Sequence, residues 1–227
     1  MKDSFIVEPS YMADACVIWL HGLGANGHDF KALLPQLELN ENHTIRFIFP
    51  NAPVQPVKIN AGMEMPAWYD IRRIDDIKRE VDHKGILLSI QRINDIVEAQ
   101  INAGINSENV ILAGFSQGGV IAGLSAICSR YKLGGVLLLS TYLPDWAYFQ
   151  QHMTESNIKT QFIVAHGVDD SVVPLAAGEL LKQTLIDEGF CVKDYHYPMG
   201  HTLCAEEIQM IASFIKEKLC LQWIKSP

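Results

Sequence analysis

The sequence predicts an α/β fold in which helices cover both faces of a mostly parallel sheet. Short apolar runs typical of buried strands alternate along the chain with longer segments whose apolar residues recur at helical spacing. Such alternation is typical of parallel sheets, because parallel strands are joined by crossovers that are usually helical. The 227 residues include 48% hydrophobic and 19% charged side chains, enough for a large core. We find no internal repeat and no linker, so one domain is expected over residues 1–227.

The first half of the chain is expected to contribute two strands and two helices. Apolar runs at residues 16–20 and 45–49 indicate strands, and spaced apolar residues between them indicate a short helix. A long helix follows, because apolar residues recur every three or four positions until Gly104 ends the pattern. The short helix carries Phe30, Leu33, Leu34 and Leu37, and the long one carries Ile86, Ile90, Ile93, Val97 and Ile101.

The second half is expected to contribute four strands and three helices. The strands are predicted at residues 110–113, 136–139, 162–165 and 192–197. Helices are predicted over residues 119–130 and over residues 176–188, where Gly189 ends the pattern. One side of the terminal helix carries Ile208, Ile211, Ile215 and Leu219. We expect this side to face the core, although contact with a membrane surface is the alternative.

Residues 50–84 break the alternation of strands and helices. The segment contains Pro50, Pro53, Pro56 and Pro66 and ends in a charged run at residues 72–84. A connection of this length inside a compact domain is usually functional or disordered, so we expect a long loop near the site. Its apolar and aromatic residues at 57–69 either line a pocket or pack as a surface loop. The charged run is expected to be a solvated face.

Composition disfavours several classes of partner and location. The net charge is −8 with no cluster of basic residues, which disfavours nucleic acid and anionic membranes as main partners. No window approaches the roughly 20 apolar residues that span a bilayer, and the start of the chain lacks a signal-peptide pattern. An odd number of cysteines without paired spacing is typical of a reducing compartment, so a cytoplasmic location is expected. The cysteines are Cys16, Cys128, Cys191, Cys204 and Cys220.

The pattern Gly114-Phe115-Ser116-Gln117-Gly118 lies between a predicted strand and a predicted helix. A strand, a sharp turn and a helix form a nucleophile elbow, which holds a serine at the carboxyl end of a sheet. Glycines on both sides permit the tight turn, because a Cβ atom there would clash. An ordinary glycine-containing loop is the alternative, but the flanking elements favour Ser116 as a nucleophile.

A serine nucleophile needs a base that takes its proton and an acid that orients the base. In elbow-containing enzymes the acid and the base follow the serine in that order along the chain. Asp169 and Asp170 both follow the strand at 162–165, and position alone permits either. For the base we prefer His201, which lies in a loop after the last strand, to His196, which lies within that strand.

Two backbone amides are expected to bind the oxyanion of the tetrahedral intermediate. One is the N–H of Gln117, the residue after the nucleophile. The other is expected in the loop His21-Gly22-Leu23-Gly24, which follows the strand at 16–20. Glycines on both sides of Leu23 leave the backbone free to turn that N–H inward.

Seven motifs in order, spread over nearly the whole chain, make the sequence similar to the phospholipase/carboxylesterase family, which includes the acyl-protein thioesterases. They are Trp19-Leu20-His21-Gly22-Leu23-Gly24, Phe49-Pro50-Asn51-Ala52-Pro53, Met65-Pro66-Ala67-Trp68-Tyr69-Asp70, Gly114-Phe115-Ser116-Gln117-Gly118-Gly119, Leu143-Pro144, His166-Gly167 with Asp170 and Val173-Pro174, and Gly200-His201. The resemblance implies an α/β-hydrolase fold and an esterase that needs no cofactor and no metal.

The resemblance also implies roles for individual residues. It assigns the acid to Asp170, three residues before the Val-Pro pair, beside Ser116 as nucleophile and His201 as base. It assigns the oxyanion amides to Leu23 and Gln117. Residues near the acyl chain would be Met63, Met65, Trp68, Tyr142, Leu143 and Leu175. Two departures from the family pattern, Val168 and Tyr142, leave the triad intact and bear on substrate preference.

We therefore expect a serine carboxylesterase that acts on carboxylic or thio esters of acyl chains through an acyl-enzyme. The expected substrate is a small-molecule ester, a lysophospholipid or an acylated protein, and lysophospholipase and acyl-protein thioesterase are the alternatives within this class. A binding protein on a hydrolase scaffold is the non-enzymatic alternative. A metal site among His21, His28, Asp29 and His166 is disfavoured by their spacing. Monomer and homodimer both stay open, as does transient contact with a membrane surface.

Overall fold

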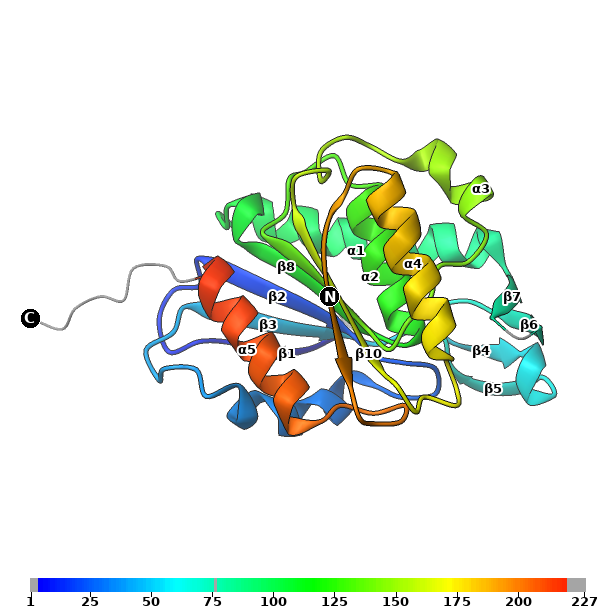
Figure 1. Ribbon diagram of the computed structural model, residues 1–227. Helices are drawn as coiled ribbons and strands as arrows, with labels where there is room; N and C mark the ends of the chain where they lie inside the picture. The colour runs from blue at the N-terminus through cyan, green and yellow to red at the C-terminus, as the bar shows by residue number, and fades with distance from the viewer. Residues whose placement is uncertain (1–3, 76, 220–227) are drawn as a thin grey trace, which may run out of the picture.

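A seven-stranded sheet forms the centre of the protein (Figure 1). The structure, a computed structural model, describes residues 4–75 and 77–219. The strands of this sheet are β1 (Ser4–Val7), β2 (Ala15–Leu20), β3 (Ile45–Pro50), β8 (Val110–Phe115), β9 (Gly135–Leu139), β10 (Gln161–Gly167) and β11 (Cys191–Tyr197). Their order is β1-β3-β2-β8-β9-β10-β11, and every neighbouring pair is parallel except β1 and β3. The predicted α/β fold is confirmed.

Helices cover both faces of the sheet (Figure 1). One face packs against α1 (His83–Asn102), α2 (Gln117–Ile127) and α4 (Leu175–Asp187), and the other against α5 (Ala205–Leu219) and the 3₁₀ helix η1 (Gly27–Leu37). Successive residues of β2 point to opposite faces, so that Ile18 belongs to the first core and Trp19 to the second. The central strands are apolar along their whole length because both of their faces are buried.

The segment at residues 50–84 is not the single long loop that its prolines suggested. It forms two antiparallel hairpins, β4 (Val54–Val57) with β5 (Met63–Pro66), and β6 (Ile71–Asp75) with β7 (Lys78–Val81). The first hairpin turns at Ala61 and Gly62, both of which have positive φ. These strands are four or five residues long and exposed at many positions, so they lack the apolar runs that mark a buried strand.

Smaller elements also differ from expectation. The edge strand β1 was not predicted, because its four residues are only half-buried, and neither was the short helix α3 (Trp146–Phe149). The helix after the elbow ends at Ile127, three residues earlier than expected.

Cys16 is buried and Cys191 is exposed, whereas Cys220 lies outside the described residues. Within residues 4–75 and 77–219, no helix combines the length and hydrophobicity required to span a bilayer.

The apolar side of the terminal helix faces the core, as expected. Ile208, Ile211, Ile215 and Leu219 are all buried, and they belong to the core between α5, η1 and the sheet. The apolar side of α5 is therefore covered by this chain itself.

Candidate active site

The loops that carry the predicted site residues follow four parallel strands of the central sheet, which lie on both sides of β9. Leu23 follows β2, Ser116 follows β8, Asp170 follows β10 and His201 follows β11. Because the carboxyl ends of parallel strands lie at one edge of a sheet, these loops converge there. The edge is where ligands usually bind in open α/β sheets.

Ser116 lies on a strained turn between β8 and α2. Its backbone has φ 55° and ψ −122°, a conformation that residues other than glycine rarely adopt. Glycine is required on both sides: a Cβ on Gly114 would lie 2.3 Å from the carbonyl oxygen of Gly118, and one on Gly118 would lie 2.4 Å from that of His21. The sequence pattern thus reflects direct backbone contact, and α2 begins at Gln117, directly after the serine.

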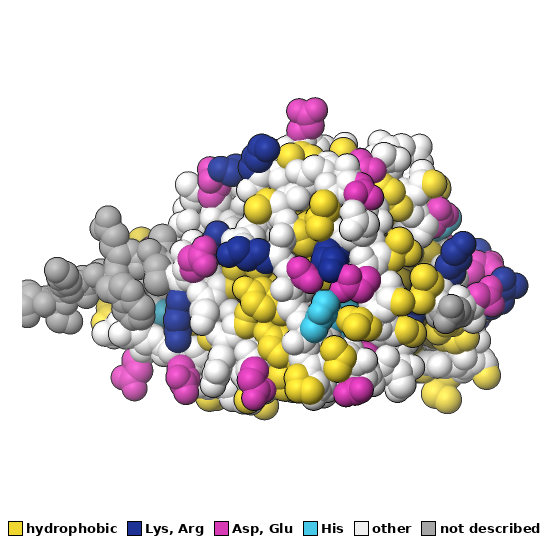
Figure 2. Space-filling model, viewed as in Figure 1, with side chains coloured by type: hydrophobic (Ala, Val, Ile, Leu, Met, Phe, Trp, Pro, Cys, Tyr) yellow, Lys and Arg dark blue, Asp and Glu magenta, His cyan; other side chains and the backbone are white. Residues whose placement is uncertain are grey.

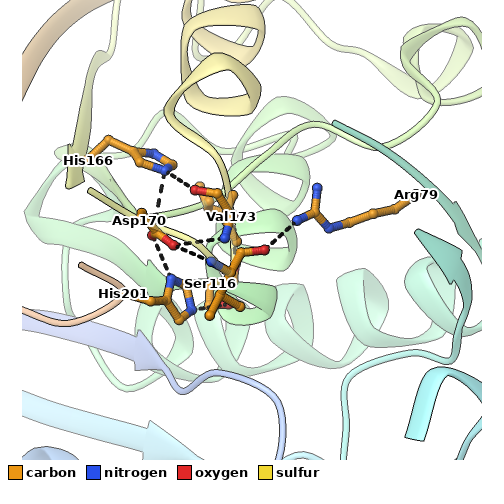
Figure 3. A network of polar contacts seen from close by, with 8 residues as sticks. Arg79, Ser116, His166, Asp170, Val173 and His201 are labelled. Atoms are coloured by element: carbon orange, nitrogen blue, oxygen red, sulfur yellow. Dashed lines mark hydrogen bonds and ion pairs between the residues drawn. The ribbon is translucent and has the colours of Figure 1, made fainter. Parts of the chain in front are cut away.

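Three side chains distant in sequence form one row of close contacts (Figure 3). His201 Nε2 lies 2.9 Å from Ser116 Oγ, and His201 Nδ1 lies 2.7 Å from Asp170 Oδ2. The carboxylate is fully buried, whereas 17% of the His201 side chain is exposed. These distances permit a proton to move from the hydroxyl to the imidazole while the carboxylate holds the ring.

Asp170 is held in place from its own loop. Its Oδ1 accepts hydrogen bonds from the backbone N–H groups of Val172 and Val173, at 2.9 and 2.8 Å. His166 contacts the same loop: its Nε2 lies 2.8 Å from the carbonyl oxygen of Val173, and burial lowers the pKa of that imidazole. The neutral His166 ring can donate this hydrogen bond and so brace the loop.

The two alternatives that the sequence left open differ clearly in position. Asp169, unlike its neighbour, is exposed, and its backbone N–H donates to Met199 O at 3.1 Å. His196 pairs with Glu179 at 2.8 Å on the outer face of β11. Asp170 and His201 are thus the members of each pair that the structure brings to Ser116.

Leu23 and Gln117 both line the pocket that contains Ser116. Neither backbone N–H donates a hydrogen bond to another residue within the described ranges. The loop of Leu23 approaches the nucleophile closely, since a Cβ on Gly22 would lie 3.4 Å from Ser116 Cβ. Two amides beside the serine and without a protein acceptor fit the geometry that an oxyanion requires.

His21 shapes the loop of Leu23 instead of holding a metal. Its Nε2 accepts a hydrogen bond from the backbone N–H of Ala52 at 3.0 Å, and its Nδ1 lies 2.7 Å from Gly22 O. Burial lowers the pKa of this imidazole, which favours the neutral ring. Because the Nε2 lone pair is occupied, the Nδ1 proton donates to Gly22 O and both ring nitrogens have partners.

The site opens into a largely apolar pocket of about 600 Å³, a size that suits a small organic ligand. Apolar side chains from η1, the two hairpins and the loops after β10 and β11 form much of its lining. They include Phe30, Leu33, Ile59, Ile71, Ile74, Phe115, Val172, Val173 and Leu203.

Among the residues expected to contact the acyl chain, Tyr142 lines this pocket and the other five do not. Met63 is 64% exposed at the hairpin turn, and Met65 packs beside Asn60. Trp68 is buried, with its indole N–H bonded to His21 O at 2.8 Å. Leu143 packs against the core, and Leu175 is the first residue of α4.

Arg79 is a pocket residue that sequence reasoning missed. The charged run that contains it was expected to be solvated, yet Arg79 is only 8% exposed and lines the pocket. In β7 the exposed and buried residues alternate, and Arg79 shares its buried face with Val81. That alternation is a weak signal, because a strand of four residues offers only two inward positions.

One group of described side chains outside the pocket has ligand-type atoms within reach of one another, namely Glu179, Asp194 and His196. The Lys182 ammonium lies 3.1 Å from Asp194 and also contacts Glu179, so the group is an ion-pair network on α4 and β11. Figure 2 shows charged side chains around a histidine near the middle of the face that it displays. The lysine already supplies the positive charge that the carboxylates need.

Comparisons with known proteins agree with the geometry. The family model described as Phospholipase/Carboxylesterase matches residues 1–219. The chain is 37% identical to acyl-protein thioesterase 1 of Neurospora crassa, with 90% of this chain and 87% of that protein covered. It is 31% identical to carboxylesterase SOBER1 of Arabidopsis thaliana, with 93% and 96% covered.

Solved structures give the same result. The crystal structure of Arabidopsis thaliana SOBER1 superposes with a TM-score of 0.86 at 30% identity, covering 90% of this chain and 99% of that one. That of Zea mays acyl-protein thioesterase 2 gives a TM-score of 0.82 at 25% identity, with 95% and 98% covered. The resemblance drawn from the motifs is confirmed: the chain belongs to the phospholipase/carboxylesterase family of α/β hydrolases.

Proposed function

We propose that this enzyme hydrolyses carboxylic esters or thioesters of acyl chains through a covalent acyl-enzyme on Ser116. The row of contacts from Asp170 through His201 to Ser116, at 2.7 and 2.9 Å, is the observation that carries the proposal. The adjoining pocket supports an acyl substrate because most of its lining is apolar.

In the proposed reaction, Ser116 Oγ attacks the carbonyl carbon while His201 Nε2 accepts the hydroxyl proton. Asp170 Oδ2 accepts a hydrogen bond from the Nδ1–H of His201 and stabilises the imidazolium. The N–H groups of Leu23 and Gln117 bind the oxyanion that forms on the carbonyl oxygen. His201 then donates its proton to the departing alcohol or thiol, which leaves an acyl group on the serine.

The second half of the reaction repeats these steps with water. His201 takes a proton from a water molecule, which attacks the acyl-serine carbonyl, and the same two amides bind the second oxyanion. The acid then departs and His201 returns the proton to Ser116 Oγ. The proton that Ser116 loses to the departing alcohol or thiol is replaced by a proton from water, so the enzyme returns to its starting state.

Esters and thioesters are both proposed because the relatives carry both kinds of name, acyl-protein thioesterase and carboxylesterase. The natural substrate would then be a small ester, a lysophospholipid or an acylated protein.

We also propose one domain, a cytoplasmic location and action as a monomer or homodimer, with transient contact with a membrane surface when the substrate lies there. The odd cysteine count supports a reducing compartment.

The test compares wild type with Ser116→Ala on a panel of acyl 4-nitrophenyl esters and acyl thioesters of graded chain length. We expect wild type to turn over members of the panel and to be labelled by a fluorophosphonate, and Ser116→Ala to lose both properties while it stays folded. Ser213→Ala, on the exposed side of α5, is the matched serine control. Turnover or labelling that survives Ser116→Ala would exclude the proposed nucleophile, and a binding protein would show neither in wild type.

A further inference from the structure

Arg79 is a buried cation in the wall of the candidate active site. It is 8% exposed, although it lies on the β6–β7 hairpin at the surface of the molecule. The other two arginines of this hairpin are more exposed and lie beside carboxylates, Arg72 with Asp82 and Arg73 with Asp75. No carboxylate within residues 4–75 and 77–219 forms an ion pair with Arg79, which distinguishes it from both.

The groups that contact Arg79 are neutral. Its guanidinium donates to the carbonyl oxygens of Val172, at 3.0 Å, and Ile77, at 3.3 Å. It also lies over the ring of Tyr142, with Cζ 4.1 Å from the ring centroid. A guanidinium has five N–H donors, and two carbonyls and a ring face leave several of them without an acceptor. None of these contacts neutralises the positive charge.

The tyrosines nearby cannot neutralise Arg79 either. The hydroxyl oxygens of Tyr69 and Tyr142 lie 2.7 Å apart, and both side chains are buried. Burial raises the pKa of Tyr142 to about 12 and that of Tyr69 well above its usual value, so both phenols stay protonated. A buried charge without a counter-ion is unfavourable, and such a charge in a pocket is best explained by an anion that enters with the ligand.

Arg79 faces the reacting groups rather than bulk solvent. It lines the same pocket as Ser116 and His201, and its hydrogen bond to Val172 O joins it to the loop that carries Asp170 (Figure 3). Asp29 also lines the pocket, but it is exposed and its Oδ2 accepts from the backbone N–H of Asn26 at 2.8 Å. The pocket therefore holds a buried cation and a carboxylate that is already bonded elsewhere.

We propose that Arg79 is a specificity-determining residue that binds an anionic oxygen group, a carboxylate or a phosphate, carried by the ester substrate at a distance from the scissile bond. The inference rests on the proposed esterase function and narrows its substrate class to acyl esters with a negative charge. A planar guanidinium suits both anions, since each presents two oxygens to its N–H groups.

The test uses pairs of substrates that differ only in charge. One arm compares the 4-nitrophenyl monoester of adipic acid with its methyl-capped diester, which places a carboxylate or a neutral ester on the acyl chain. The other arm compares a 1-acylglycerol 3-phosphate with the uncharged 1-acylglycerol, which places a phosphate on the alcohol. In wild type we expect kcat/KM to favour the charged member of at least one pair by about 10- to 100-fold, the range typical of a charge-assisted hydrogen bond.

The variants are Arg79→Gln, Arg79→Lys and the control Arg73→Gln, which removes a positive charge from the same hairpin at an exposed site. The ratio of kcat/KM within each pair is determined for each variant, so a loss common to both substrates cancels. We expect Arg79→Gln to bring the ratio close to one and Arg79→Lys to retain part of it, because lysine keeps the charge without the planar fork. Arg73→Gln should keep the wild-type ratio.

The outcomes separate this proposal from the one on which it rests. If wild type hydrolyses the neutral esters but favours neither charged member, the anion site is excluded and the esterase function stands. If wild type hydrolyses no member of any pair, the proposed function itself fails. Should Arg79→Gln not fold, inhibition of wild type tests the site without any variant. Competitive inhibition by adipate or inorganic phosphate, but not by a simple salt at equal ionic strength, supports the site.

Discussion

Gln117 is bonded through its side chain to the backbone of Trp68. Its Oε1 accepts from the N–H of Trp68 and its Nε2 donates to the carbonyl oxygen of Tyr69, each at 2.8 Å. Gln117 thus joins the elbow to the segment between β5 and β6, and its own backbone N–H is the amide that we assign to the oxyanion. Trp68, expected in the acyl-binding wall, does not line the pocket, and its backbone N–H holds the Gln117 side chain instead.

Gln117→Ala should therefore affect stability and turnover together. It keeps the amide of residue 117 but leaves the buried N–H of Trp68 and the carbonyl of Tyr69 without partners, which costs about 1–3 kcal/mol of unfolding free energy. We expect kcat for an aryl ester to fall by roughly tenfold or more, because the oxyanion amide is held less firmly. Urea unfolding and steady-state kinetics measure the two effects. Gln91→Ala, on the exposed face of α1, should change neither, and equal losses in the two variants would contradict the assigned role.

Asp170→Asn should reduce kcat far more than Asp169→Asn. An amide at position 170 can still accept from the loop N–H groups, but it no longer carries the charge that orients and stabilises the His201 imidazolium. Replacing a triad acid in this way costs about 10⁴-fold in kcat, whereas the exposed Asp169 makes no contact with the imidazole. Turnover of a 4-nitrophenyl ester by each purified variant measures the difference. Similar losses from both substitutions would mean that the acid is misassigned.

The triad could be proposed from the sequence because each member follows a predicted strand, and two of these three strands, β8 and β10, are plain apolar runs. Ser116, Asp170 and His201 come after the buried strands β8 and β10 and the edge strand β11, and parallel strands bring their ends to one edge. The glycines of the elbow added a second constraint, since the backbone of Gly118 touches that of His21. Local pattern and chain order were sufficient to propose the serine and the histidine, whereas the choice of Asp170 over Asp169 came from the family resemblance.

The wall of the pocket could not be predicted in the same way. Ile59 and Ile74 line the pocket from the two short hairpins, whose strands are only four or five residues long. Strands this short carry little periodic signal. Arg79 looks like any other member of a charged run until its tertiary contacts are known. Met63 has the expected apolar character, but the turn of its hairpin directs it to solvent.

Ile74→Ser should shift acyl-chain preference. Ile74 lines the pocket from β6, and each methylene that it shields from water is worth about 0.8 kcal/mol. We expect the ratio of kcat/KM for a dodecanoyl ester to that for a butanoyl ester to fall by about three- to tenfold, because the short chain depends less on this contact. Met63→Ser is the matched control, since Met63 is 64% exposed and does not line the pocket. A shift caused by Met63→Ser and not by Ile74→Ser would place the acyl chain on the outer surface of the hairpin.

Glu207 should make the protein less stable as pH rises. This carboxyl, in the first turn of α5, is fully buried, and neither of its oxygens has a hydrogen-bond partner in the described part of the chain. Burial raises its pKa to about 8. The folded state therefore holds a proton that the unfolded state releases near pH 4.5. The stability linked to this proton is complete below pH 4.5 and declines as pH rises to about 8, by a few kcal/mol at most.

Glu207→Gln should remove that decline, because its amide is neutral at every pH. We expect the unfolding free energies of wild type and Glu207→Gln to be similar at pH 4 and to diverge by pH 9, with the variant more stable. The comparison cancels the titration of the histidines, which both proteins share. Glu206→Gln is the neighbouring control: Glu206 is exposed, and hydrogen bonds from its own backbone N–H and from Cys204 lower its pKa, so it contributes stability that is lost as pH falls. Urea unfolding across this range decides the matter, and a wild-type decline that persists in Glu207→Gln would show that another group causes it.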